Sequence, residues 1–333
     1  MTGRKVALTG IKPSGTPHLG NYLGMIRPAL DLVRTYDAYY FIADGHALTT
    51  VQNAEQMREL SYEAAATMLA LGLDPEKVVF YRQSDVPQTF ELAWILSCVT
   101  PKGLLNRAHA YKASVDENVA AGRTPDDGIS MGLYGYPLLM AADILIVDSH
   151  VVPVGSDQRQ HVEIARDIAE SFNRTFGDIL VLPEPLIEDS VATIGGLDGR
   201  KMSKSYGNVI PIFASPKEQR KLVMRIVTDS RPPTEPKDPA SDNLFRIFEH
   251  FGSPDAVASV RDRYTSGGIG YGEVKSMLAE ALEEHFAEPL ARYIELMADR
   301  TRLDEMLAAG AERAGTVADD VLGRVRKAVG FRA

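Results

Sequence analysis

The sequence predicts an α/β protein, with a parallel-sheet domain over residues 1–205 and an all-helical domain over residues 206–333. In the first half, short apolar runs alternate with helical patterns, which is typical of a parallel sheet covered by helices on both faces. After about residue 206 these runs disappear, prolines cluster, and alanine-rich acidic helical segments follow. The last helix could pack back on the first domain.

The expected elements follow one another along the chain. Strands are indicated by four short apolar runs, at residues 5–10, 38–43, 77–82 and 151–155. Helical spacing occurs at 19–36, where Pro28 interrupts it, and at 53–73, 92–98, 157–176, 272–297 and 301–326. Asn53 and Gln56 resemble a capping box at the start of one helix. Residues 115–130 indicate a flexible loop. Because ligands of such sheets bind at the carboxyl ends of the strands, we expect the site there.

Composition restricts the class of protein. Apolar residues make up 45% of the 333 residues, and no run approaches the roughly 20 needed to span a bilayer. The N-terminus lacks the apolar core and cleavage pattern of a secretory signal. Cys98 is the only cysteine, which excludes an internal disulfide and a multi-cysteine metal site. We therefore expect a cytoplasmic protein with no membrane contact.

The net charge is −9, yet basic residues gather locally. Residues 201–237 contain eight Lys or Arg against three acidic residues. Such a stretch can be a solvated helix face or a local surface for nucleic acid, and charge alone does not separate the two.

The first segment with chemical meaning is TGIKPSGTPHLGNYLG, residues 9–24. A strand ends near Gly10, a tight turn containing Ser14 follows, and a helix opens at His18. Glycines let a ligand approach the backbone, and a helix N-terminus favours phosphate. His18 and Asn21 are three positions apart and can lie on one side of the helix. A simple turn with a helix cap is the alternative.

The second segment is Lys201-Met202-Ser203-Lys204-Ser205, which follows a glycine-rich stretch at 195–199. Lysine ammonium groups suit phosphate oxygens. The glycines would let this loop close over a substrate. Two lysines on a surface loop have little meaning alone, but they gain meaning beside the His18 segment.

Together the two segments resemble the HIGH and KMSKS signatures of class I aminoacyl-tRNA synthetases, with Asn21 in place of the final His. Further strings at 44–49, 136–146, 153–163 and 227–230, and Asn243-Leu244, resemble the bacterial type of tryptophanyl-tRNA synthetase. Tyrosyl enzymes share the lysine loop but usually carry Gln-Ala where this chain has Met-Ala-Ala before Asp143. The resemblance implies a Rossmann-like catalytic domain and a helical tRNA anticodon-binding domain.

The resemblance also implies the reaction. Tryptophan and ATP with Mg would form tryptophanyl-adenylate and pyrophosphate, and the tryptophan would pass to tRNA(Trp). Positioning and electrostatics can supply most of this catalysis without a protein nucleophile. The family acts as a homodimer. We expect no metal site built by the protein itself, and we interpret His161 and Glu163 as non-ligands.

Nucleotide contacts are implied residue by residue. Lys201 and Lys204 would hold the phosphates, His18 and Asn21 would contact the phosphates and the ribose side, and Lys112 lies on a segment similar to another phosphate-facing loop. The remaining implied ATP contacts are Lys12, Ser14, Gly20, Gly155, Asp157, Ile194 and Met202. The chain departs from the family's usual residues at Lys12, Ala113 and Ser156.

Tryptophan needs apolar walls and one acceptor for its indole N–H. The resemblance implies Asp143 as the acceptor, Leu8 and Met140 as walls, Tyr136 and Gln158 at the α-amino group, and Ala43 and His46 completing the pocket. Asp143 alone does not separate tryptophan from tyrosine, because a phenol also donates. A tyrosine enzyme, a tRNA-independent adenylyl transferase and a non-catalytic binding protein are the alternatives. Trp94 is expected in the core or at a subunit contact.

Overall fold

The computed structural model describes residues 3–155, 158–187 and 194–332 of the chain. Its centre is a five-stranded sheet with the order β3-β2-β1-β4-β5, in which every pair of neighbours is parallel. The strands are β1 (Val6–Ile11), β2 (Asp37–Ile42), β3 (Val79–Arg82), β4 (Val151–Val154) and β5 (Glu184–Ile187). This is the strand order of a Rossmann-like sheet, so the predicted fold class is confirmed.

Helices connect the strands and build the second half. Between the strands lie α1 (Leu19–Asn21), η1 (Tyr22–Ile26), α2 (Arg27–Asp31), η2 (Leu32–Arg34), α3 (Asp44–Ala47), α4 (Ala54–Ala70), η3 (Gln83–Asp85), α5 (Gln88–Ser97), α6 (Lys102–Leu105), α7 (His109–Ala120), α8 (Met131–Leu145) and α9 (Arg159–Phe176). After the sheet come η5 (Lys204–Tyr206), α10 (Pro216–Met224), α11 (Asn243–Phe248), α12 (Pro254–Ser266), α13 (Tyr271–Ala298) and α14 (Arg300–Ala328).

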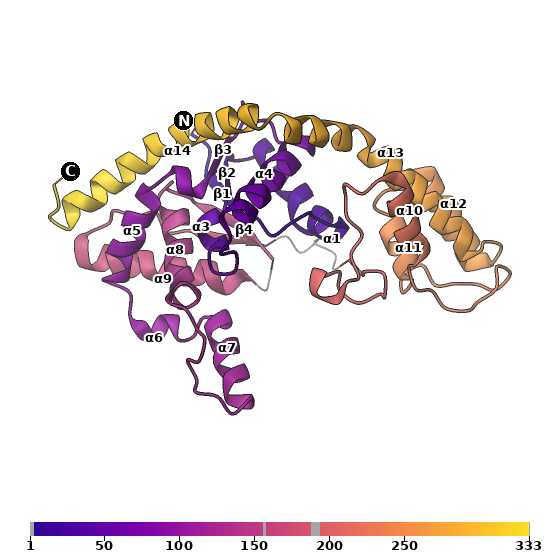
Figure 1. The fold of residues 1–333 in the computed structure, drawn as a ribbon, viewed down its shortest axis with the longest axis horizontal. Helices are drawn as coiled ribbons and strands as arrows, with labels where there is room; N and C mark the ends of the chain where they lie inside the picture. Colours follow the sequence, from indigo (N-terminus) through magenta and orange to yellow (C-terminus); the bar gives the residue numbers. More distant parts are fainter. Residues whose placement is uncertain (1–2, 156–157, 188–193, 333) are drawn as a thin grey trace.

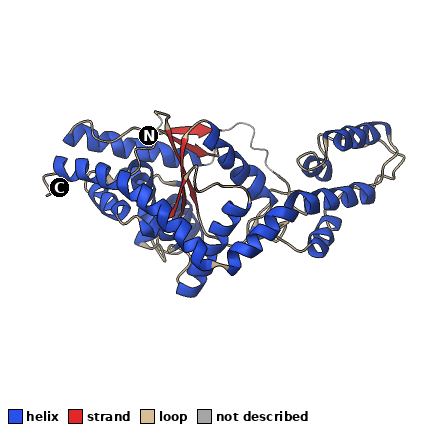
Figure 2. Ribbon diagram, turned by 90° about the horizontal axis from the view of Figure 1, so that it is seen from above, coloured by secondary structure: helices blue, strands red, loops and turns tan. Residues whose placement is uncertain are grey.

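Both faces of the sheet are buried. Side chains alternate along β2, so that Tyr40 and Ile42 join one apolar cluster while Tyr39 and Phe41 join another. The first cluster includes α4 and the helical second half, and the second includes α5, α8 and α9. Figure 2 shows helices on both sides of the strands. The strands read as continuous apolar runs because neither face meets water.

The last helix covers an edge of the sheet. Figure 1 shows α14 running along the sheet domain, and its Gly310 packs directly on the backbone of β3. Leu303 and Leu307 of α14 belong to the first apolar cluster, whereas Ala314 and Val325 belong to the second. One helix therefore spans both clusters and shields the outer edge of β3. The domain division at residue 205 stays a prediction.

The helices expected at 53–73, 272–297 and 301–326 correspond to α4, α13 and α14, and Asn53 caps α4 by accepting from Gln56 N–H at 2.9 Å. One expectation was wrong. Residues 115–120 are not a loop, since they form the second half of α7, which begins at His109. Strand β5 was not predicted, since Pro185 obscures its short pattern. In the described part of the chain, no helix is long and apolar enough to cross a membrane.

Candidate active site

The two signature segments meet beside the point where the strand order reverses. β1 lies between β2 and β4. The chain that leaves the carboxyl end of β1 therefore passes to one side, and the chain that leaves the carboxyl end of β4 passes to the other. Open α/β sheets bind ligands in this crevice. Residues 12–18 follow β1, and Gly155 follows β4. The fold therefore places the turn at residues 12–18, where the sequence predicts phosphate binding, at the expected edge of the sheet.

His18 and Asn21 form a reciprocal cap on α1. The His18 N–H donates to Asn21 Oδ1 at 3.2 Å, and the Asn21 N–H donates to His18 Nδ1 at 3.3 Å. Burial, with a smaller contribution from the Lys204 charge, lowers the pKa of His18 to about 4. A neutral ring whose Nδ1 accepts carries its proton on Nε2. The cap thus leaves an Nε2–H donor, the group needed for a phosphate or ribose oxygen.

The lysine loop lies directly on this turn. Lys204 Nζ donates to the Ser14 carbonyl at 2.8 Å, across 190 positions of sequence. The Leu19 N–H donates to the Ile210 carbonyl at 2.9 Å, which fastens α1 to the chain just beyond the loop. Gly20 contacts Met202 Sδ at 3.4 Å. The structure therefore brings together the two segments that the sequence singled out.

A residue that the sequence analysis missed organises the loop. Asn208 is 2% exposed, accepts from the Ser203 N–H at 2.8 Å and donates to Asp198 at 2.7 Å. Gly196 packs so closely on Asn208 that a Cβ would lie 2.4 Å from its carbonyl oxygen. Gly196 is therefore required for close packing of the loop, in addition to any loop closure that the glycines allow. A polar residue four positions after the second lysine was the only available signal.

The other expected nucleotide contacts are spread more widely. Lys12, Ser14 and Asn21 line one small cavity, and Lys12 Nζ is 3.4 Å from Thr49 Oγ1. Ile194 and Met202 are buried neighbours, since the Met202 N–H donates to the Ile194 carbonyl. Lys201 is exposed on the loop, whereas exposed Lys112 is on α7, which projects from the body of the molecule (Figure 1). Gly155 is exposed, and Asp157 lies outside the described residues.

Asp143 is held in a buried polar cluster. It is 2% exposed on α8, its Oδ2 lies 2.8 Å from His46 Nε2, and its Oδ1 accepts from Gln83 Nε2 at 2.7 Å. Burial raises the pKa of the carboxyl group, and the hydrogen bonds from His46 and Gln83 oppose that change. Sequence reasoning missed Gln83, although it follows the carboxyl end of β3. Each carboxylate oxygen has a further lone pair, so the cluster can still accept from a ligand.

The rest of the expected amino-acid pocket gathers around this cluster. Leu8 and Ala43 are buried in the apolar cluster on this face, and Met140 packs against it. The Tyr136 ring lies edge-on to His46 with centroids 6.4 Å apart, and its hydroxyl is hydrogen-bonded to His161. Gln158 is exposed at the start of α9. His161 is thus a neighbour of the pocket through Tyr136.

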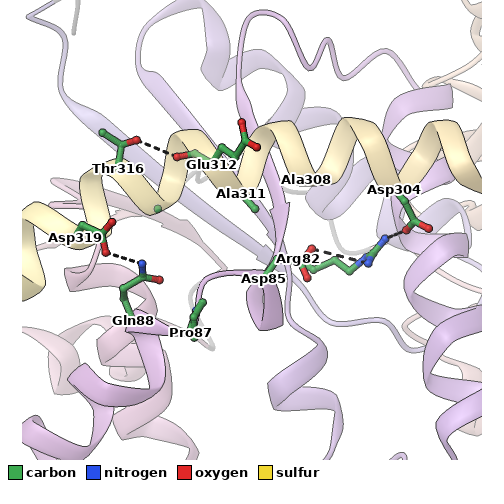
Figure 3. A pocket seen from close by; sticks show the side chains of 11 residues that line it. Arg82, Asp85, Pro87, Gln88, Asp304, Ala308, Ala311, Glu312, Thr316 and Asp319 are labelled. Atoms are coloured by element: carbon green, nitrogen blue, oxygen red, sulfur yellow. Dashed lines mark hydrogen bonds and ion pairs between the residues drawn. The ribbon is translucent and has the colours of Figure 1, made fainter.

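A larger hollow of about 600 Å³ lies elsewhere, between α14 and the segment after β3. Figure 3 shows its polar rim, where Arg82 pairs with Asp304 and Gln88 with Asp319. None of the expected site residues lines it. Within the described ranges, no three His, Cys, Asp or Glu side chains gather as a metal site would require.

Comparison with known proteins agrees with this geometry. Residues 2–287 match the family model of tRNA synthetases class I (W and Y). The tryptophan–tRNA ligase of Pseudomonas aeruginosa is 51% identical over 98% of this chain and 73% of its own length. That of Neisseria meningitidis is 48% identical over 99% of this chain and 98% of its own.

Solved structures give the same result. The tryptophanyl-tRNA synthetase of Campylobacter jejuni, complexed with ADP and tryptophan, has a TM-score of 0.89 at 44% identity and covers 98% of this chain and 100% of its own. The tyrosyl-tRNA synthetase of Archaeoglobus fulgidus shares the fold, with a TM-score of 0.63 at 21% identity. The chain therefore belongs to the family of class I tRNA synthetases for tryptophan and tyrosine.

Proposed function

We propose that this chain is a tryptophan–tRNA ligase, which activates tryptophan with ATP and transfers it to tRNA(Trp). The observation that carries the proposal is the hydrogen bond from Lys204 to the Ser14 carbonyl, which joins two distant signature segments at the carboxyl end of β1. Tryptophan is favoured over tyrosine because the relatives that share about half of the sequence are tryptophan–tRNA ligases. ATP is favoured because the Campylobacter relative was crystallised with ADP.

The residues would divide the first step as follows. His18 Nε2–H and the ammonium groups of Lys201 and Lys204 bind the phosphates and stabilise the charge that develops on the pyrophosphate. Gly20, Met202 and Ile194 form the adenosine side. ATP would bring its own Mg, bound through its phosphates.

The tryptophan side would rest on the Asp143 cluster. Because His46 and Gln83 fix both carboxylate oxygens, the acceptor is oriented before the indole N–H arrives. Tyr136 and Gln158 orient the α-amino group, which places the tryptophan carboxylate for attack on the α-phosphate of ATP. A buried acceptor that requires a donor discriminates strongly against side chains lacking one.

We further propose that the enzyme works as a cytoplasmic homodimer. Trp94 on α5 is 70% exposed, and Phe90 one turn earlier is 41% exposed. An aromatic pair at the surface supports a subunit contact and argues against a core role for Trp94.

The test is ATP–pyrophosphate exchange with each of the twenty amino acids supplied separately. We expect exchange with tryptophan alone, a loss of roughly 100-fold or more in Lys204→Ala, and weaker exchange in Asp143→Ala. Lys217→Ala, at an exposed lysine of α10, is the matched control and should leave exchange unchanged. Exchange with tyrosine would overturn the proposed pocket. No exchange in folded protein would overturn the assignment as a ligase.

A further inference from the structure

Tyr22 connects the signature cap to the second half of the chain. It follows Asn21 directly, and its N–H donates to the His18 carbonyl at 3.0 Å. It also opens η1, a π-helical turn over Tyr22–Ile26, and is 8% exposed. π-Helical turns are rare, and those that are found frequently lie at functional sites. The backbone of Tyr22 thus helps to define where the His18 ring stands.

The side chain of Tyr22 reaches α13. Its hydroxyl oxygen lies 2.8 Å from His285 Nε2, across 263 positions of sequence. Phe251 and Phe286 complete the cluster, with ring centroids 6.2 Å and 5.2 Å from the Tyr22 ring. The Phe286 and His285 rings meet edge to face at 4.7 Å. These three rings would pack equally well around a phenylalanine at position 22. The Tyr22 hydroxyl therefore adds one directional contact to a cluster that is otherwise held by apolar packing.

The cap is held from two sides. Helix α1 contains three residues and runs on without a break into η1 and α2. The Leu19 N–H donates to the Ile210 carbonyl and the Ile212 N–H donates to the Pro17 carbonyl, and these main-chain bonds hold one side. The Tyr22–His285 contact holds the other side, and its loss would remove the one directional side-chain contact between this segment and α13. Displacement of a positioned group by about 1 Å is enough to slow an enzyme.

We propose that Tyr22 and His285 are positioning residues for adenylate formation, which hold the His18–Asn21 cap in place through α13. This inference rests on the proposed function, because it assigns the cap a role in binding ATP. The hydroxyl–imidazole contact acts on the orientation of His18, not on the affinity for tryptophan.

The experiment is a double-mutant cycle on ATP–pyrophosphate exchange. Tyr22→Phe removes only the hydroxyl, and His285→Phe keeps a ring but removes the nitrogen. We expect each to lower kcat about three- to tenfold with an unchanged KM for tryptophan, and the double variant to be no slower than either single one. His285→Gln, whose amide can still bond the hydroxyl, should recover part of the rate.

Tyr62→Phe is the matched control, because the Tyr62 hydroxyl donates at 2.9 Å to Asp304 of α14, away from the cap. It should shift the melting temperature as Tyr22→Phe does, without slowing exchange. Equal effects of Tyr22→Phe and Tyr62→Phe on kcat, or additive effects in the cycle, would overturn the inference. Absence of exchange in the wild type would instead overturn the proposed function.

Discussion

Asn208 is a single buried amide that fixes the lysine loop. Its two main hydrogen bonds, to the Ser203 N–H and to Asp198, lie on either side of the loop. We expect Asn208→Ala to lower kcat for exchange by roughly tenfold, because Lys204 would no longer be held over the turn, and to lower stability by about 1–3 kcal/mol. Steady-state exchange kinetics and denaturant unfolding measure the two effects.

Asn173 provides the control for this prediction. Its amide also closes a turn, by accepting from the Leu180 N–H at 2.9 Å and donating to the Leu180 carbonyl at 2.8 Å. Asn173→Ala should lower stability similarly and leave kcat unchanged. Equal kcat losses in the two variants would mean that Asn208 acts through stability alone.

His18 makes a prediction about pH. Its pKa of about 4 lies below the ordinary 6.5, so folding favours the neutral ring. The stabilisation is complete above pH 6.5 and is lost as the pH falls from there towards 4. In His18→Asn, which keeps a good cap residue, this loss should be absent. The difference in unfolding free energy between wild type and variant should therefore change between pH 6.5 and 4, and a constant difference would contradict the prediction.

Residue chemistry could be predicted where a motif carried it. The His18 and Lys204 segments were singled out from residue type and spacing, and the structure joins them. Gln83 and Asn208 could not be found, because a lone polar residue after a strand or a loop is usually solvated. Their burial depends on contacts with Asp143 and Asp198, which sequence patterns do not reveal.

At the scale of elements, apolar periodicity located the long helices and the buried strands. It failed where a pattern is short or irregular. The stretch at 19–36 divides into α1, η1, α2 and η2, because the π-turn and Pro28 break the regular helical register. The sequence does not predict helix α7 beyond residue 115, since the exposed side chains of this helix give almost no apolar stripe.

Gly310 determines how closely helix α14 packs on strand β3. A Cβ there would lie 1.8 Å from the Phe80 carbonyl oxygen, so α14 and β3 would have to separate. We expect Gly310→Ala to lower the free energy of unfolding by about 1–3 kcal/mol. Gly323, on the same helix, has nothing within 4 Å of an added Cβ. Gly323→Ala should raise stability by about 0.5–1 kcal/mol. Denaturant unfolding of both variants checks the opposite signs, and the same sign in both would refute this account of the α14–β3 contact.

Over the whole molecule, the acidic balance and the local basic stretch serve different purposes. A net charge of −9 repels a polyanion, so tRNA must approach a surface where cations outnumber acids. Helix α10 presents such a surface, with Lys217, Lys221 and the adjoining Arg225 all exposed. In contrast, Arg231 is neutralised by Asp229 at 3.1 Å.

This distribution predicts that tRNA binding and tryptophan activation respond differently to charge. The double variant Lys217→Ala with Lys221→Ala should raise the KM for tRNA. It should also reduce the slope of the logarithm of the tRNA binding constant against the logarithm of the salt concentration by roughly one to two, because each phosphate contact releases a counterion. Pyrophosphate exchange should not change, since α10 is separate from the cap and the Asp143 cluster. Arg174→Ala with Lys327→Ala removes the same charge from other exposed helix positions. If that control weakened tRNA binding equally, net charge and not the α10 surface would govern recognition.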